Sequence, residues 1–241
     1  QAHPDWTPAM ARSALMTTAS QAVVDNDRVS PAEPIAMGSG HMDLGGKAQK
    51  GSSFQPGLAY DAGLFEYAAF SCGQDWGIFS QNSCDFLEGI GVPSEAYNLN
   101  YPSIGIANLP GTQTVTRTVT SVADDSGWRD YSVSVDAPEG YEVTVNPDSI
   151  RLKPGQTATY EVTINNLSAP LGEWRYGSLT WSDKTGHYDV RSPIAVNGSL
   201  FSASEAVEGS GASGSASFDV KFGYTGSYSA APHGLVADAP S

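Results

Sequence analysis

Positive charge is scarce in this sequence of 241 residues. Lys and Arg total 12 against 26 Asp and Glu, which gives a net charge of −14 and a pI near 4.4. Such a surface repels phosphate backbones and anionic lipids, so we exclude nucleic acid and anionic membrane surfaces as partners. Long apolar runs are also absent: none approaches the roughly 20 residues that span a bilayer, which predicts no membrane span.

Cysteine and histidine are equally rare. The two cysteines, Cys72 and Cys84, have no nearby His and cannot complete a tetrahedral zinc site. In an exported protein they form a local disulfide, and in a reducing compartment they are two free thiols. No EF-hand or His-Glu-x-x-His pattern occurs, so we predict no metal site and no cofactor, and we interpret Asp124-Asp125 as a solvated loop.

The first periodic segment is a short helix near the start. Thr7 followed by Pro8 is a helix N-cap with proline in the first turn. Met10, Ala14 and Leu15 follow at helical spacing and predict a buried apolar stripe, which the β-branched residues at 17–18 bring to an end. An amphipathic surface helix of any globular protein has the same pattern.

Residues 20–97 are rich in turn signals. The glycine-containing stretches 38–43 and 56–61 predict turns and not strands. A short helix is expected over residues 64–70, followed by a loop that contains both cysteines and a linker through Pro93.

From residue 99 onward the hydrophobic period becomes two. Apolar residues alternate with polar ones over 131–135, 141–145, 160–164, 179–181 and 188–190, and Pro- or Gly-containing turns separate these runs. Residues 114–122 form a β-branched run in which Arg117 is expected to face outward. Seven or eight short strands at this spacing predict a mainly β fold, an antiparallel β-sandwich of about 100 residues.

The last part of the chain changes composition again. Residues 198–217 are rich in Gly, Ser and Ala, which is typical of a flexible linker. Residues 218–222 alternate like a strand, and they either begin a further β-segment or add an edge strand to the sandwich.

Several motifs resemble one protein family. The sequence HPDWTPAMARSALMTTA at 3–19 resembles the stretch that follows the nucleophile in subtilisin-like serine proteases. GSGHMD at 38–43 and PGLAYD at 56–61 resemble the end of the catalytic domain in the plant-type branch, with departures at Met42 and Leu44 and extra polar chain at 51–53. LNYPSI at 99–104, TVTRTVT at 114–120 and residues 177–194 resemble the fibronectin type III-like domain that follows it.

The resemblance implies a domain organisation. Residues 1–70 would be the helical and irregular C-terminal remnant of an α/β subtilisin-like catalytic domain, and 71–98 a cysteine-containing linker. Residues 99–197 would be the fibronectin type III-like sandwich, and 198–241 the Gly/Ser-rich linker with the start of a further β-segment. We expect the sandwich to fold alone and residues 1–60 to be poorly protected or covered by a partner chain.

The resemblance also implies a function. The chain would be the non-catalytic C-terminal portion of a secreted serine endopeptidase that cleaves peptide bonds by Ser-His-Asp acyl transfer. In the family the triad and the oxyanion-hole Asn precede the position that residue 1 matches, so no residue here is expected to be catalytic. The sandwich would stabilise the catalytic domain or mediate substrate access or self-association. Expected partners are the catalytic domain or another copy, with peptide substrate bound only through the parent enzyme.

Two other functions compete with this one. The chain would be a freestanding β-sandwich for binding or adhesion if its N-terminal helices were an unrelated cap. It would be an independent hydrolase if His41 formed a triad with Asp43 and Ser39, although a glycine-rich turn supplies no fixed oxyanion hole. The resemblance places His3 and His41 at structural positions, whereas His187 falls in a sandwich turn and His233 in the tail.

Overall fold

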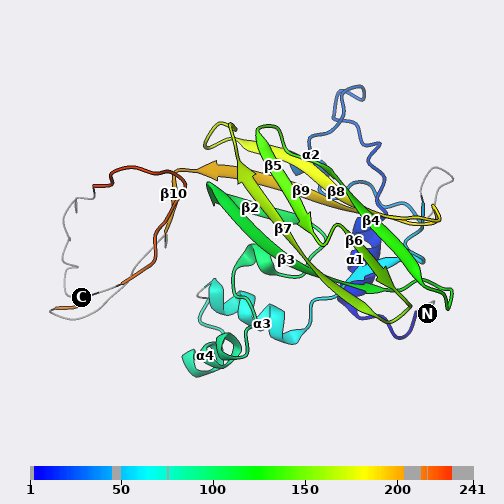
Figure 1. Ribbon diagram of the computed structural model, residues 1–241, viewed down its shortest axis with the longest axis horizontal. Coiled ribbons are helices and arrows are strands. Elements are labelled where there is room, and N and C mark those ends of the chain that lie inside the picture. The colour runs from blue at the N-terminus through cyan, green and yellow to red at the C-terminus, as the bar shows by residue number, and fades with distance from the viewer. Residues whose placement is uncertain (1–2, 45–49, 75, 204–212, 216, 230–241) are drawn as a thin grey trace.

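The computed structural model describes residues 3–44, 50–74, 76–203, 213–215 and 217–229, and its centre is a two-layered β-sandwich (Figure 1). One sheet has the strand order β1-β3-β7-β5 and the other the order β2-β9-β8-β4-β6. The fold is mainly β, as the period-two pattern predicted. The strands are β1 (Leu58–Tyr60), β2 (Ile104–Pro110), β3 (Thr112–Ser121), β4 (Arg129–Asp136), β5 (Tyr141–Asn146), β6 (Ser149–Leu152), β7 (Thr157–Asn166), β8 (Trp174–Asp183) and β9 (Asp189–Ser199).

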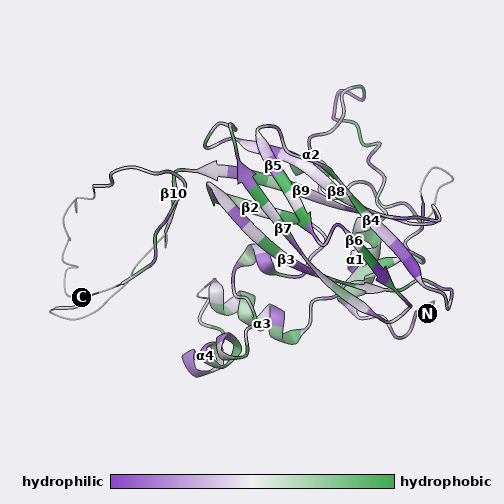
Figure 2. Cartoon of the chain, in the orientation of Figure 1, coloured by the Kyte–Doolittle hydropathy of each residue, from purple (hydrophilic) through white to green (hydrophobic). Residues whose placement is uncertain are grey.

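The core lies between the two sheets, where apolar side chains alternate with polar ones along each strand (Figure 2). Trp181 is its largest wholly buried side chain, and its indole meets the ring of Tyr160 edge-on at 5.1 Å between centroids. Figure 2 shows the alternation as successive green and purple segments along the strands. Other members of this core are Leu58, Tyr60, Ile104, Ile106, Leu109, Val115, Val119, Tyr131, Val162, Ile164, Leu179, Val190, Ile194 and Val196.

Two features of the sheets differ from the sequence prediction. The first is that β2 pairs with β9 in parallel, with Ile104 opposite Ile194, whereas the other paired strands of the sandwich run antiparallel. Gly111, at a φ of +71°, lies between β2 and β3, and the chain crosses there from one sheet to the other. Because of that crossing, β2 pairs with β9 and not with its neighbour in sequence.

The second difference is strand β1 itself. We predicted turns over 56–61, but Leu58–Tyr60 pairs antiparallel with β3, with Tyr60 opposite Val119. All three residues of β1 are buried. The Pro56-Gly57 pair is a strong turn signal, and the strand that follows it is only three residues long, too short to show a period of two.

The N-terminal helix α1 (Pro8–Thr17) has the predicted bounds. Its N-cap is Thr7, whose side chain accepts a hydrogen bond from the Met10 backbone, and Thr18 is the C-cap. The buried face differs from the predicted stripe, since it consists of Ser13, Ala14 and Thr17. Leu15 is 38% exposed, because α1 packs on β1 through its small residues.

Two further helices form a hairpin below the sandwich (Figure 1). The predicted helix at 64–70 extends as α3 (Leu64–Gly73), and the expected cysteine loop contains α4 (Gln81–Gly89). A disulfide joins Cys72 to Cys84, which confirms the first of the two alternatives for these cysteines. The remaining short helices are α2 (Pro34–Met37) and the 3-10 helix η1 (Ala96–Asn98).

The final described segment folds back on the end of β9. Strand β10 (Phe201–Ser202) pairs antiparallel with β11 (Lys221–Phe222) and forms a small separate sheet. The strand predicted at 218–222 is therefore confirmed only over its last two residues, and it pairs with β10 and not with the sandwich edge. No described helix is long or apolar enough to cross a bilayer.

Candidate functional site

Buried polar groups gather where residues 55–61 meet the sandwich, and we call this region the strand seam. Tyr60 is at its centre. Its backbone N–H, which faces away from β3, donates to the Ser13 hydroxyl of α1 at 2.9 Å. Tyr60 is 1% exposed. Its hydroxyl lies 2.6 Å from that of Tyr160 on β7 and 2.8 Å from that of Ser192 on β9. Tyr60 therefore joins α1 to both sheets.

The three hydroxyls form a structural network and not a reactive one. Burial raises the pKa of Tyr60 and of Tyr160 above the usual value, so both phenols stay protonated at neutral pH. Ser192 is wholly buried and cannot reach a substrate. The arrangement satisfies polar groups inside the core, where an unpaired hydroxyl would cost about 1–3 kcal/mol.

Arg117 supports the same region from β3. We expected it to face outward, but it is 2% exposed and donates to three backbone carbonyls. The acceptors are Tyr101 O at 2.9 Å, Thr116 O at 2.8 Å and Ser103 O at 3.1 Å. Burial lowers the pKa of Arg117. Its role is to hold the segment that leads into β2.

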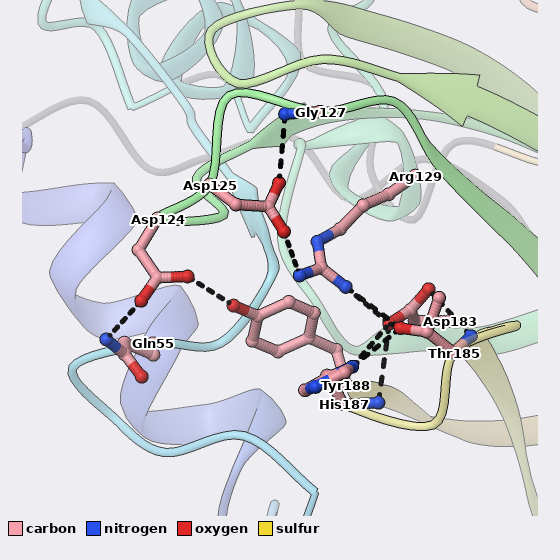
Figure 3. Close-up of polar contacts among 9 residues, drawn as sticks. All are labelled: Gln55, Asp124, Asp125, Gly127, Arg129, Asp183, Thr185, His187 and Tyr188. Carbon is pink, nitrogen blue, oxygen red and sulfur yellow. Dashed lines mark hydrogen bonds and ion pairs between the residues drawn. The ribbon is translucent and has the colours of Figure 1, made fainter.

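A second network lies at the other end of β1 (Figure 3). The Arg129 guanidinium contacts Asp183 at 2.7 Å and also pairs with Asp125. The Asp183 side chain is wholly buried and accepts a hydrogen bond from Thr185 as well. Asp124 and Asp125 lie in an exposed loop, as predicted, and both carboxylates also bind neighbouring side chains.

This network reaches the strand seam through Tyr188. The guanidinium of Arg129 lies 4.8 Å from the centroid of the Tyr188 ring, and the Tyr188 hydroxyl donates to Asp124 at 3.0 Å. Gln55 donates to the other oxygen of Asp124 at 2.7 Å. The Tyr188 ring also covers Gly57 so closely that a Cβ there would lie 2.5 Å from it. Figure 3 shows these side chains as one continuous chain of contacts from Gln55 to Asp183.

The charge state of Asp183 follows from opposing effects. Burial alone would raise its pKa, but hydrogen bonds from Thr185 and His187 and the charge of Arg129 together lower the pKa below its ordinary value. Asp183 is thus ionised at neutral pH and pairs with a cation.

The histidines do not gather at one place among the described residues. His3 bonds the Phe54 carbonyl at 2.7 Å and stacks on Trp6. His41 is exposed, and its backbone pairs with that of Ser20. His187 lies in the turn between β8 and β9, as predicted, and His233 lies outside the described residues. Within the described part of the chain, no group of three His, Cys, Asp or Glu could hold a metal ion.

An apolar pocket of about 420 Å³ opens beside α1, on the side away from β1. Trp6, Leu15 and Phe54 contribute much of its lining. Of the predicted stripe only Leu15 lines this pocket, and Leu15 and Phe54 are 38% and 51% exposed.

The sequence pattern missed most residues of the seam. Tyr60, Arg129, Asp183 and Tyr188 come from four separate segments, and no local motif joins them. A usable signal existed for Tyr188, in the alternation over 188–190, and for Arg117, which has the same parity along β3 as the buried residues Val115 and Val119. We gave its charge more weight than its position in the alternation, and so predicted that Arg117 faces outward.

Comparisons with known proteins find similarity over most of the chain. Residues 98–196 match the family model of a fibronectin type-III domain. The CO(2)-response secreted protease of Arabidopsis thaliana is 35% identical over 205 residues, a match that covers 81% of this chain and 26% of that protein. The subtilisin-like serine-protease S of Lotus japonicus is 33% identical over 206 residues, with 81% and 26% covered. The match to these proteases extends well beyond the fibronectin domain.

Solved structures add little. A FixG-related protein from Vibrio parahaemolyticus matches 38% of this chain and 82% of its own at 13% identity, with a TM-score of 0.32. The chain spans about a quarter of the length of the curated relatives it matches. The chain thus contains a fibronectin type-III domain at 98–196, and 81% of it is similar to plant subtilisin-like proteases.

Proposed function

We propose that this chain is the non-catalytic C-terminal part of a secreted subtilisin-like serine endopeptidase, and that its sandwich stabilises the catalytic domain. The observation that carries the proposal is strand β1. This strand belongs by resemblance to the end of the catalytic domain, yet its three residues are wholly or almost wholly buried as part of a sandwich sheet.

We call this arrangement, in which a sandwich sheet holds strand β1 and through it the protease segment, the clamp. The free energy of burial supports it. Burying Leu58 and Tyr60 contributes about 1.5–3 kcal/mol for each side chain, and the Tyr60 hydroxyl adds two buried hydrogen bonds. Helix α1 is held in turn by the bond from Tyr60 N to Ser13 and by the 2.6 Å bond from Thr7 to Asp61. In the parent enzyme α1 would lie beside the nucleophile helix. The sandwich would then support the catalytic serine through α1 without contacting substrate.

The adhesion alternative is less well supported. It required N-terminal helices unrelated to any protease, whereas the similarity to subtilisin-like proteases covers 81% of the chain. Secretion is supported by the similarity to the CO(2)-response secreted protease and by the disulfide, a bond that persists in oxidising compartments.

The clamp can be tested in the full-length protease with the change Tyr60→Ala. Because the clamp holds the domain without touching substrate, we expect kcat/KM at room temperature to change little and the half-life of activity at elevated temperature to shorten at least tenfold. Tyr228→Ala is the matched control, since Tyr228 is 54% exposed and lies far along the chain from β1. Equal half-lives for the two variants would contradict the clamp.

The absence of catalysis in this chain alone has a separate test. A fluorophosphonate probe labels activated serines, and we expect no labelling of this chain at concentrations that fully label a complete subtilisin-like protease. Stoichiometric labelling of any serine here would overturn the assignment as a non-catalytic part.

A further inference from the structure

Strand β1 is separated from the rest of its sheet by a long excursion of the chain. After Asp61 the chain leaves the sandwich, forms α3 and α4, and returns at η1, where Asn98 accepts a hydrogen bond from the Thr116 N–H of β3. In Figure 1 the α3–α4 hairpin lies outside the two sheets, so this connection adds little to the seating of β1.

Apart from helix α1, which precedes β1 in the chain, residues after 98 supply the contacts that hold residues 57–61. The Val122 N–H donates to Gly57 O at 2.9 Å, and β3 supplies the ladder. The Asn100 side chain donates to both Asp61 O and Thr118 O, each at 2.9 Å, and so ends the strand. The Tyr60 hydroxyl is hydrogen-bonded to the hydroxyls of Tyr160 and Ser192.

The same contacts select a particular sequence. The first position must be glycine, because its φ is +82° and the Tyr188 ring excludes a Cβ. The next needs an aliphatic side chain for the core, as Leu58 supplies. The third must be small, since Ala59 is wholly buried, and the fourth must carry the phenol of Tyr60. When a peptide binds by adding a strand to a sheet edge, the main-chain hydrogen bonds give affinity and the pockets for alternate side chains give specificity.

From these contacts we propose that the fibronectin domain contains a strand-acceptor site, which binds an extended Gly-Leu-Ala-Tyr segment whether or not that segment is covalently joined to it. If the chain is cut between β1 and η1, the two fragments should therefore stay bound to each other through β1 and α1. The proposal deepens the clamp function, because the strand that is bound is the one that continues into the protease segment.

The test uses the full chain with a site-specific protease sequence inserted between Ser94 and Glu95, both exposed. Both cysteines then lie in the first fragment, so the disulfide does not link the two pieces. After folding, the chain is cut and passed over a size-exclusion column at micromolar concentration. We expect the fragments to elute together as one species.

Substitutions show whether β1 is the link. Leu58→Asp places a charge in the core position and should release the first fragment, whereas the same change at Leu64, which is 75% exposed on that fragment, should not. Near-ultraviolet circular dichroism of the uncut chains shows whether each variant has folded. If Leu58→Asp does not fold, Tyr60→Phe serves instead. It removes the two buried hydrogen bonds of the Tyr60 hydroxyl, so we expect the cut fragments to dissociate faster by roughly tenfold or more.

Separation of the wild-type fragments after cutting would overturn the strand-acceptor site. Co-elution of cut Leu58→Asp fragments to the same extent as Leu64→Asp would also overturn it. This experiment measures binding and not proteolysis, so the two proposals can fail separately. If the wild-type fragments separate but Tyr60→Ala still shortens the thermal half-life of the protease, the clamp stands and only the acceptor site is overturned.

Discussion

Arg129 and Asp183 form a buried ion pair that anchors the second network of the strand seam. Their side chains are 9% and 0% exposed, and the two atoms that pair lie 2.7 Å apart. A buried pair of this kind adds little over apolar packing, but the loss of one partner leaves a charge unpaired inside the protein. The pair therefore gives a residue-level test of the seam.

We predict that Asp183→Asn lowers the free energy of unfolding by about 3 kcal/mol, because Arg129 loses its buried counter-charge and keeps only the partly exposed Asp125. Urea unfolding followed by tryptophan fluorescence measures the change. Asp130→Asn is the control: its partner Arg151 lies 3.7 Å away and both side chains are largely exposed, so the expected loss is below about 1 kcal/mol. Similar losses for both variants would contradict the role of burial.

The lowered pKa of Asp183 predicts a pH dependence with a definite sign. Its stabilising contribution is fully present above the pKa of the unfolded chain, near the ordinary 3.8, and is lost as the pH falls through the lower folded value. The wild type should therefore lose more stability than Asp183→Asn between about pH 5 and about pH 2. Parallel pH curves for the two proteins would contradict the assignment.

Arg117 shows what residue-level sequence reasoning could and could not provide. The alternation over 112–121 placed it on the face of Val115 and Val119, so its burial was predictable. Its three carbonyl acceptors were not, because two of them belong to residues 101 and 103, which the tertiary fold brings beside β3. An unpaired buried cation is costly, and only those acceptors make the inward position tolerable.

Among the elements, the α3–α4 hairpin depends most on its covalent link. Its own core consists of Ala68, Ala69 and Leu87, with Cys72 and Val92 packed against it. Many of its larger apolar residues are exposed instead, including Phe65, Trp76 and Phe86 at 55%, 58% and 59%. A core of this size cannot hold two short helices, so the disulfide supplies much of their stability.

We predict that the double change Cys72→Ser and Cys84→Ser raises amide exchange throughout residues 64–92. The cross-link closes a short loop, and its loss should cost the hairpin about 3 kcal/mol, or on the order of a hundredfold in protection. Hydrogen–deuterium exchange with mass spectrometry measures this. Strands β3 and β7 are the internal reference, and an equal rise there would show that the disulfide stabilises the whole molecule instead.

Helix prediction succeeded where the pattern was strong and failed where it was polar. Helix α1 had a cap, a proline and an apolar period, and its bounds are as predicted. Helix α4 was missed because Gln, Asn, Ser and Asp dominate it, a composition typical of loops. Its N-cap was visible in retrospect, since the Ser80 hydroxyl accepts from the Ser83 N–H.

At the scale of the whole molecule, strand β1 joins the N-terminal segment to the sandwich. Our expectations that residues 1–60 are poorly protected or covered by a partner chain, and that the sandwich folds alone, remain predictions to be tested. The structure gives reasons against each of them, because Leu58 and Tyr60 belong to the sandwich core and α1 buries Ser13, Ala14 and Thr17 against its surroundings.

Deletion of residues 1–61 provides the test. Losing two core side chains should cost several kcal/mol, which corresponds to a fall in Tm of roughly 10–20 °C for a chain of this size. Differential scanning calorimetry measures it. An unchanged Tm would show that the sandwich is self-sufficient, in which case residues 58–60 occupy its edge without stabilising it.

The sequence by itself determined the mainly β architecture, the bounds of α1 and the family resemblance, because each depends on local pattern: a period of two, a cap with a proline, and contiguous motifs. Only the tertiary structure decided that β1 completes a sheet, that β2 runs parallel to β9, and that Tyr60, Arg117 and Asp183 are buried with partners. Those features depend on residues far apart along the chain. Their free energy comes from contacts that no short window of sequence contains.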